Sequence, residues 1–268
     1  TCFPSLCLRD ARRCAIEMLP RHFPRVPLFL ATVSLMVITT VLSRSHPVFM
    51  AARRRFLGRG VTSKVVIDRE GARAVYYPDF IPQKDATELF DVLRCLHHWE
   101  SKPIQLFGKM VTQPRMITSF SDPGVKYRYT NVTNEGHRWI PELEELRRKL
   151  EAFVGQGKRF NFCLLNLYRN GSDYMGWHCD DEREMEGPIA SVSLGETRDF
   201  VFKEKANRTS KHFLELESGS LLVMNEETQK LFLHSLPRRA KVQNCRINLT
   251  FRCIVDPRHD EEPNQTTA

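Results

Sequence analysis

The chain has 268 residues, 41% of them hydrophobic, which is enough for one sizeable domain with tails. Its formal net charge of +8 fits a polyanionic partner, although a basic surface can also serve solubility alone. The eight cysteines show no paired spacing, which excludes a disulfide framework and a zinc ribbon and predicts free thiols.

The N-terminal part is predicted to lie outside the fold. Residues 1–49 form an extra segment that contains an uncharged apolar run, residues 26–42, at the lower length limit for a membrane span. Two interpretations stay open, a signal anchor or upstream sequence joined to a chain that starts at Met50, and we favour the second. Residues 50–74 are basic and poor in aromatic residues, which predicts a flexible tail, and residues 257–268 form a second tail.

The domain is predicted to span residues 75–256 and to open with a strand and turn. A first helix should begin at a capping box of Asp85 and Glu88 and end near Trp99. Its apolar stripe consists of Leu89, Val92, Leu93 and Leu96.

A second helix should begin at Pro141 and stop at Gly155. Its inward-facing residues are Leu143, Leu146, Leu150 and Phe153. We interpret both helices as buttresses of a sheet.

The stretch between the helices is predicted to meet the substrate. It holds a glycine-containing hairpin with Phe107 near its tip, and an apolar side chain in such a place can wedge into a base stack. The alternative is a hairpin aromatic that is buried in the protein's own core.

From residue 160 to 255, strands alternate with Gly, Pro and charged turns, which predicts a two-sheet, jelly-roll-like antiparallel core. An apolar strand near its start leads to His178 and Asp180. Two positions apart on an extended segment, these side chains share a face and can bind one metal ion, as two thirds of a 2-His-1-carboxylate Fe(II) site. His234 follows an apolar run and precedes a proline turn, which suits a third ligand. A His-x-Asp sequence alone often marks only a solvated turn.

Residues 245–253 have the period of a strand with one polar face. That face carries Arg246, Asn248, Thr250 and Arg252. Two arginines on one face require an anion, and a dicarboxylate can bind them through charge-assisted hydrogen bonds. A solvent-exposed polar face is the alternative.

These motifs, in this order, resemble the AlkB family of Fe(II)- and 2-oxoglutarate-dependent dealkylating dioxygenases, and are most similar to its animal double-strand-DNA repair branch. The resemblance covers about residues 76–255 and includes PIASVSLG, RDFVFK, GSLLVMN, HSLP and INLTFR. It implies an α+β, mainly β fold, a double-stranded β-helix (jelly-roll) with N-terminal buttressing helices and a nucleotide-recognition hairpin lid within residues 76–135. Two positions depart from the branch, which carries an acidic residue in place of Trp177 and Trp in place of Phe232.

The resemblance also implies the chemistry. Fe(II) would be held by His178, Asp180 and His234, with O2 as a second co-substrate. The other co-substrate, 2-oxoglutarate, would be bound by Asn166, Tyr168, Arg246, Thr250 and Arg252. The expected activity is oxidative removal of N-alkyl groups (1-methyladenine, 3-methylcytosine, etheno adducts) from flipped bases of double-stranded DNA, releasing formaldehyde and succinate.

The substrate side is implied in the same way. The residues expected to bind the damaged nucleotide are Phe107 as the finger, Gly108, Lys109, Arg115, Tyr127, Arg128, Tyr129 and Asp181. A carboxylate such as Asp181 favours cationic methylated bases, although it could be an ordinary solvated acid. Arg208 and Lys211 lie in a basic segment that could contact phosphates or be a solvated turn.

Further expectations concern partners. Residues 55–59 resemble the peptide by which this branch docks on the replication sliding clamp, except that Gly58 replaces an aliphatic residue. A nuclear monomer without a membrane segment is expected. The competing functions are a non-catalytic DNA-binding module, a zinc hydrolase, and a 2-oxoglutarate oxygenase of single-stranded DNA or RNA or of a substrate that is not a nucleic acid.

Overall fold

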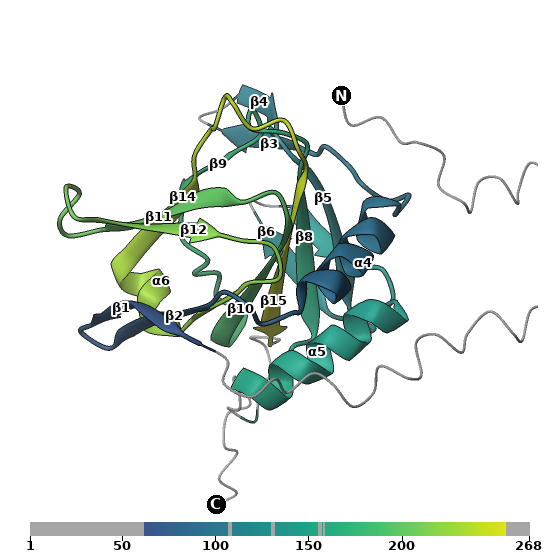
Figure 1. Ribbon diagram of the computed structural model, residues 1–268, viewed down its shortest axis with the longest axis horizontal. Coiled ribbons are helices and arrows are strands. Elements are labelled where there is room, and N and C mark those ends of the chain that lie inside the picture. The colour runs from purple at the N-terminus through teal and green to yellow at the C-terminus, as the bar shows by residue number, and fades with distance from the viewer. Residues whose placement is uncertain (1–61, 107–108, 130–131, 155–156, 158, 256–268) are drawn as a thin grey trace, which may run out of the picture. The chain divides into compact units, whose positions relative to one another are not determined.

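A seven-stranded antiparallel sheet forms one wall of the domain in the computed structural model, which describes residues 62–255 except for 107–108, 130–131, 155–156 and 158 (Figure 1). Its strands lie in the order β1-β2-β13-β10-β15-β8-β5. Their bounds are β1 Lys64–Arg69, β2 Ala72–Tyr77, β5 Met116–Ser121, β8 Phe162–Tyr168, β10 Met185–Gly195, β13 Leu221–Met224 and β15 Arg246–Ile254. β8 is buried along its whole length and β15 along nearly all of it, so polar residues on these strands are held away from bulk water.

A four-stranded antiparallel sheet faces it, in the order β12-β11-β14-β9. The bounds are β9 Met175–His178, β11 Arg198–Glu204, β12 Lys211–Leu216 and β14 Phe232–Leu236. On β12, Leu214 and Leu216 are buried whereas Phe213 and Glu215 are exposed, so one face of this sheet meets the core and the other meets solvent. The two facing sheets confirm the predicted jelly-roll-like core.

An apolar cluster joins the sheets at one end. It includes Ile67, Ala74 and Ile189 from the larger sheet, packed with Phe202 and Leu214 of the smaller sheet. Burial of these side chains is the main attractive contribution to holding the sheets together. The other end of the space between the sheets is left for polar groups.

Two helices buttress the larger sheet, as predicted, α4 (Gln83–Arg94) and α5 (Pro141–Val154) (Figure 1). α5 begins at Pro141 as expected. It buries Leu143, Leu146, Arg147 and Leu150. Its half-buried Phe153 contacts Tyr77 and Phe80 edge-on. The apolar spacing therefore located this helix correctly.

The predicted ends of α4 were wrong. The N-cap residue is Pro82, which offers no side-chain cap hydrogen bond, and Asp85 lies inside the first turn, where its charge interacts favourably with the helix dipole. The helix stops at Arg94 and not near Trp99, whose indole donates a hydrogen bond to the carbonyl of Leu93 at 3.1 Å. A short helix that was not predicted, α6 (Glu226–Leu231), precedes β14.

The sheet also begins earlier than expected. β1 and part of β2 lie within residues 50–74, so the predicted tail is too long and the boundary at residue 75 falls inside β2. Glu70 and Gly71 both have positive φ, as in the two-residue turns that match the twist of a hairpin. Basic composition concealed this hairpin, because only alternate residues of β2 are buried.

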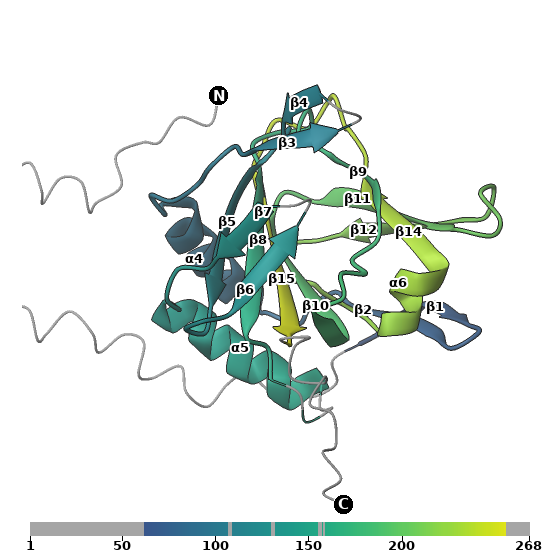
Figure 2. The ribbon, with the colours of Figure 1, turned by 180° about the vertical axis from the view of Figure 1, so that it is seen from behind.

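Two small hairpins flank β5 in sequence, β3 (Pro103–Leu106) with β4 (Lys109–Thr112), and β6 (Lys126–Tyr129) with β7 (Val132–Glu135). Figure 2 shows β7 alongside β5, and they are in contact. Both hairpins lie within residues 76–135, the range in which recognition hairpins were expected. None of the helices that the structure describes is long and apolar enough to cross a bilayer.

Candidate metal and co-substrate site

Three side chains that could hold a metal ion converge beside the smaller sheet. His178 ends β9, and His234 lies directly opposite it on β14, so the two rings approach to 4.2 Å between centroids. Asp180 follows two residues after His178, and ligand atoms of the three side chains all lie within 4.8 Å of one another. One metal ion can therefore contact all three.

The protonation of these groups suits a divalent cation. Burial lowers the pKa of His234 to about 3, and burial also lowers the pKa of His178, so both rings are neutral at pH 7. His178 Nδ1 lies 2.9 Å from the carbonyl of Gly176, which favours a proton on Nδ1 and leaves Nε2 free. Within the described residues, the buried Nδ1 of His234 has no hydrogen-bond partner.

Asp180 is held in place by groups around it. Its burial opposes ionisation, but the positive charge of Arg252 holds the pKa of the Asp180 carboxyl well below its usual range. One oxygen of Asp180 lies 3.0 Å from an Arg252 nitrogen, and the Asp180 N–H donates to the side chain of Gln229 on α6. Such supporting contacts fix the direction of a ligand.

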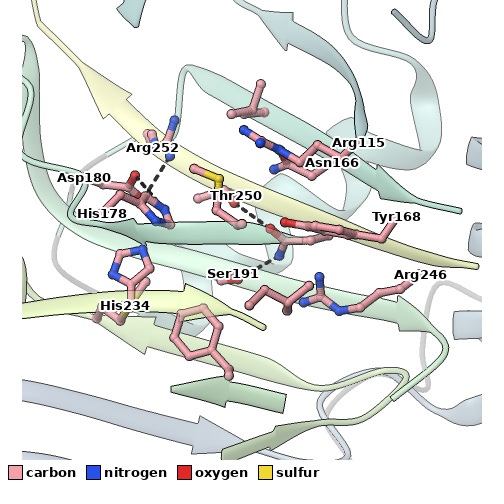
Figure 3. Close-up of a pocket in the computed structure, with 16 residues that line it drawn as sticks. Arg115, Asn166, Tyr168, His178, Asp180, Ser191, His234, Arg246, Thr250 and Arg252 are labelled. Carbon is pink, nitrogen blue, oxygen red and sulfur yellow. Dashed lines mark hydrogen bonds and ion pairs between the residues drawn. The ribbon is translucent and has the colours of Figure 1, made fainter. Parts of the chain in front are cut away.

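Arg246 lies at the opposite end of the pocket (Figure 3). It is 2% exposed and donates to Ser193 Oγ at 3.0 Å, and its guanidinium lies over the ring of Tyr168 at 5.3 Å. Burial lowers its pKa to about 10, so it remains charged at neutral pH. Its Nε has no hydrogen-bond partner within the part of the chain that the structure describes. A buried cation with an unused donor indicates an anion-binding site.

Polar side chains of the larger sheet form the floor between these ends. Asn248 donates to Ser191 Oγ at 2.8 Å, and Thr250 donates to Asn248. Arg115, just before β5, donates to Asn166 at 2.7 Å. The pocket is lined by Arg115, Leu164, Asn166, Tyr168, Met175, His178, Asp180, Ser191, Phe200, Met224, His234, Leu236, Arg246, Asn248, Thr250 and Arg252.

A comparison with protein families identifies this arrangement. Residues 73–252 match the family described as the 2OG-Fe(II) oxygenase superfamily. This chain belongs to that superfamily. Members use Fe(II), 2-oxoglutarate and O2.

Individual relatives place the chain more closely within the 2OG-Fe(II) oxygenases. It is 44% identical to DNA oxidative demethylase ALKBH2 of Bos taurus over 57% of this chain and 57% of that protein, and 36% identical to the protein of that name from Arabidopsis thaliana over 69% and 67%. It is 32% identical to human alpha-ketoglutarate-dependent dioxygenase alkB homolog 3 over 72% and 74%. The chain therefore belongs to the AlkB family, although it spans less than two thirds of the bovine relative.

The pocket fits the co-substrates of a 2OG-Fe(II) oxygenase. Two neutral imidazoles and a carboxylate are the facial ligand set of non-haem Fe(II). Arg246, buried and incompletely bonded, lines the same pocket and can bind the remote carboxylate of a dicarboxylate. The floor between them offers the amides and hydroxyls that orient such a molecule.

The structure brings together most of the residues that were predicted for this oxygenase site. The three ligands and the five residues expected to bind 2-oxoglutarate all line one pocket. Arg115, which was expected to bind the damaged nucleotide, is only 4% exposed, donates to Asn166 and lines the same pocket.

Other predicted residues lie outside the pocket. Asp181 is exposed, accepts a hydrogen bond from Cys179 and lies 3.7 Å from Lys205, so it borders the site without lining it. Arg208 and Lys211 are exposed where β11 and β12 connect. Phe107 and Gly108 lie outside the described residues, as do the side chains of Lys109, Tyr127, Arg128 and Tyr129.

Three supporting residues of the oxygenase site were missed. Ser191 and Ser193 lie two positions apart on β10 and accept hydrogen bonds from Asn248 and Arg246. This spacing puts both serines on one face of a strand, so the sequence could have indicated them. Gln229 had no comparable signal, because its role depends on a short helix that sequence reasoning did not find.

Proposed function

We propose that this chain is a DNA repair enzyme that oxidatively removes N-alkyl groups from bases of double-stranded DNA. The substrates would include 1-methyladenine, 3-methylcytosine and etheno adducts, and the damaged base would be flipped out of the duplex to reach the pocket. Relatives from Bos taurus and Arabidopsis thaliana that carry the name DNA oxidative demethylase support this substrate class.

The observation that carries the proposal is the two-ended pocket. His178, Asp180 and His234 form a metal site at one end, and buried Arg246 offers an anion site at the other. A zinc hydrolase needs the first site but has no use for the second. A 2-oxoglutarate oxygenase needs both.

Each residue then has a defined task. His178, Asp180 and His234 would hold Fe(II), which with 2-oxoglutarate and O2 would supply the oxidation of the alkyl carbon. The methyl group would leave as formaldehyde, and 2-oxoglutarate would become succinate and CO2. Arg246 would bind the remote carboxylate of 2-oxoglutarate, kept in place by Ser193 and the Tyr168 ring. Arg252 is bonded to Asp180 and therefore belongs to the metal end of the pocket.

The residues proposed to contact the damaged DNA are supported by their charge and by their position in the chain. The methylated forms of adenine and cytosine carry a positive charge, and the exposed carboxylate of Asp181, next to ligand Asp180, would favour them over neutral bases. Phe107, Gly108, Lys109, Tyr127, Arg128 and Tyr129 remain proposed contacts of the hairpins with DNA. Arg208 and Lys211 are exposed, which supports a role with phosphates.

The test is loss of a methyl group from DNA. The full chain, loaded with Fe(II) without oxygen, receives 2-oxoglutarate, O2 and a duplex or single-stranded oligonucleotide with one 1-methyladenine, and the product is weighed by mass spectrometry. We expect methyl loss from the duplex, none with Asp180→Ala, and a selective decrease on duplex with Phe107→Ala. Succinate formation without methyl loss from either DNA would keep the oxygenase and reject the DNA substrate.

A nuclear location and contact with the sliding clamp extend the same proposal. Residues 55–59 lie outside the described residues, and the support for the contact is their basic and aromatic sequence. Phe56→Ala should reduce recovery of the clamp in a pull-down from nuclear extract, with Phe213→Ala, an exposed aromatic of β12, as the matched control. Equal recovery with Phe56→Ala would reject the contact. A monomer is expected at every concentration in light scattering.

A further inference from the structure

Trp177 is an exposed aromatic residue beside the metal site. It precedes ligand His178 on β9 and points to the opposite face of the strand, away from the pocket. Its exposed fraction is 42%, which is large for a tryptophan, and the Gly176 position beside it borders open space. The indole therefore offers an apolar surface to a partner.

Lysines gather on the same face of the smaller sheet. Lys203 of β11 reaches across β14 and places its ammonium 4.0 Å from the centre of the Trp177 ring. Lys203 also lies directly opposite Lys211 of β12. Like charges facing each other across two strands are unfavourable, and a bound anion would offset that repulsion.

The position of β9 links this face to the pocket. β9 is the edge strand of the smaller sheet, and its residues Met175 and His178 line the pocket, whereas Trp177 between them does not. A DNA strand whose base enters the pocket past β9 would leave the next nucleotide beside Trp177. That nucleotide offers a flat base and an anionic phosphate.

We propose that Trp177, Lys203 and Lys211 form a platform that binds the nucleotide adjoining the damaged base on the same DNA strand. The indole stacks against the neighbouring base through the ring face that Lys203 does not cover, and the two ammonium groups contact the backbone phosphate. The inference rests on the proposed function, because it requires a DNA strand that leaves the pocket at β9. The platform binds the strand without regard to sequence, since every base has a flat face.

The test combines changes in the protein and in the DNA. Anaerobic binding of the full chain is measured by fluorescence anisotropy, with a single-stranded oligonucleotide that carries one 1-methyladenine. Two further oligonucleotides have an abasic site on the 5′ or the 3′ side of the lesion. The proteins are wild type, Trp177→Ala, Trp177→Phe and Phe213→Ala. Phe213 is an exposed aromatic residue of β12, which β11 and β14 separate from β9.

We expect one of the abasic sites to weaken binding by wild type about tenfold, within the range for loss of one stacked base. Trp177→Ala should weaken binding of the intact oligonucleotide to the same extent and show no further loss with that abasic site. Trp177→Phe should retain part of the effect, and Phe213→Ala should behave as wild type. Lys211→Ala should reduce the dependence of binding on salt.

Two results would overturn the platform even if the chain still demethylates the same oligonucleotide. One is equal affinity of wild type and Trp177→Ala, and the other is that the abasic site weakens binding by Trp177→Ala as much as binding by wild type. A wild-type chain that binds none of the oligonucleotides and removes no methyl group would overturn the proposed function as well. The two failures are therefore distinguishable.

Discussion

Asp180 and Asp181 are neighbouring carboxylates with different surroundings. Asp180 is buried against Arg252 beside two neutral histidines, whereas the Asp181 side chain is 57% exposed and faces Lys205. Position in the pocket, and not residue type, separates a metal ligand from a surface acid. This difference can be measured.

Metal ions should stabilise the wild-type chain but not Asp180→Asn. Mn(II), which replaces Fe(II) without redox chemistry, should raise Tm by about 5 °C or more at a hundredfold excess over Kd, because binding favours the folded state by about 2.7 kcal/mol. Thermal melting with and without chelator measures the shift. The control Asp181→Asn should keep the full shift, and its loss there would contradict the assigned ligands.

Arg246→Lys should impair use of 2-oxoglutarate. The charge remains, but an ammonium cannot reproduce the forked contacts of a buried guanidinium, and charge-assisted hydrogen bonds contribute about 1.5–3 kcal/mol each. The KM for 2-oxoglutarate, measured by succinate release, should therefore rise by roughly tenfold or more. Arg94→Lys, on the exposed side of α4, serves as the control. An unchanged KM would place the remote carboxylate elsewhere.

Among single residues, the sequence correctly indicated the pocket residues that a regular spacing brings to one face. His178, Asp180 and Arg246 follow from alternation along strands. The bond from Arg115 to Asn166 was not predicted, because whether an arginine before a strand turns inward depends on an acceptor that lies 51 positions away.

One buried ion cluster joins helix α5 to both ends of the β6–β7 hairpin. Asp122, before the hairpin, accepts hydrogen bonds from Arg147 of α5 at 2.7 Å and from the indole of Trp139, after the hairpin, at 2.8 Å. Trp139 also stacks in parallel on Phe251 of β15, next to pocket residues Thr250 and Arg252. The hairpin is therefore anchored at its base to the strand that carries the arginines.

Asp122→Ala should destabilise the protein by about 1.5–3 kcal/mol, because it removes the charge-assisted hydrogen bond of the largely buried Arg147, which keeps only the more distant Glu144 and Glu151. Urea unfolding measures the difference. The matched control is Asp91→Ala, which breaks the exposed Arg94–Asp91 pair of α4 and should change stability by less than about 0.5 kcal/mol. Equal effects of the two variants would rule out a special role for the cluster.

Elements with a strong apolar period were predictable, and those defined by local geometry were not. α5 matches its predicted start and inward-facing leucines. The β1–β2 hairpin was hidden by its charged residues, and the start of α4 was misread because Pro82 caps it without a side-chain bond. Pattern alone does not show which of several polar residues ends a helix.

The stability of the whole molecule should depend on alkaline pH through Cys163. Burial in β8 raises the pKa of this thiol well above its usual value, although the positive charge of Arg252 opposes the shift. The folded state therefore keeps the proton while the unfolded chain loses it above about pH 8.5. The contribution of this proton to the free energy of unfolding should be fully present below that pH. Above it, the free energy of unfolding should fall by up to about 1.4 kcal/mol per pH unit.

Urea unfolding between pH 7 and pH 9.5 measures this slope. Cys163→Ala costs stability at every pH because it leaves a small cavity, but its slope above pH 8.5 should be shallower than that of wild type by one proton. Other thiols titrate in both proteins, so they cancel in the comparison. Equal slopes of stability against pH in wild type and Cys163→Ala would show that Cys163 does not cause the loss of stability.

The two walls of the sandwich contribute different halves of the site. Every metal-binding side chain belongs to the smaller sheet or to the turn after β9, whereas the arginines, Asn166 and Thr250 belong to the larger sheet. Within the described residues, the Arg252–Asp180 contact is a direct ion pair between these halves. Mutations at Arg246, at the far end of β15, can therefore change which acid is accepted without touching a metal ligand, whereas mutations at Arg252 would also disturb the ligand Asp180. The two specificities can thus diverge separately in evolution, or be exchanged separately by design, only from the Arg246 end.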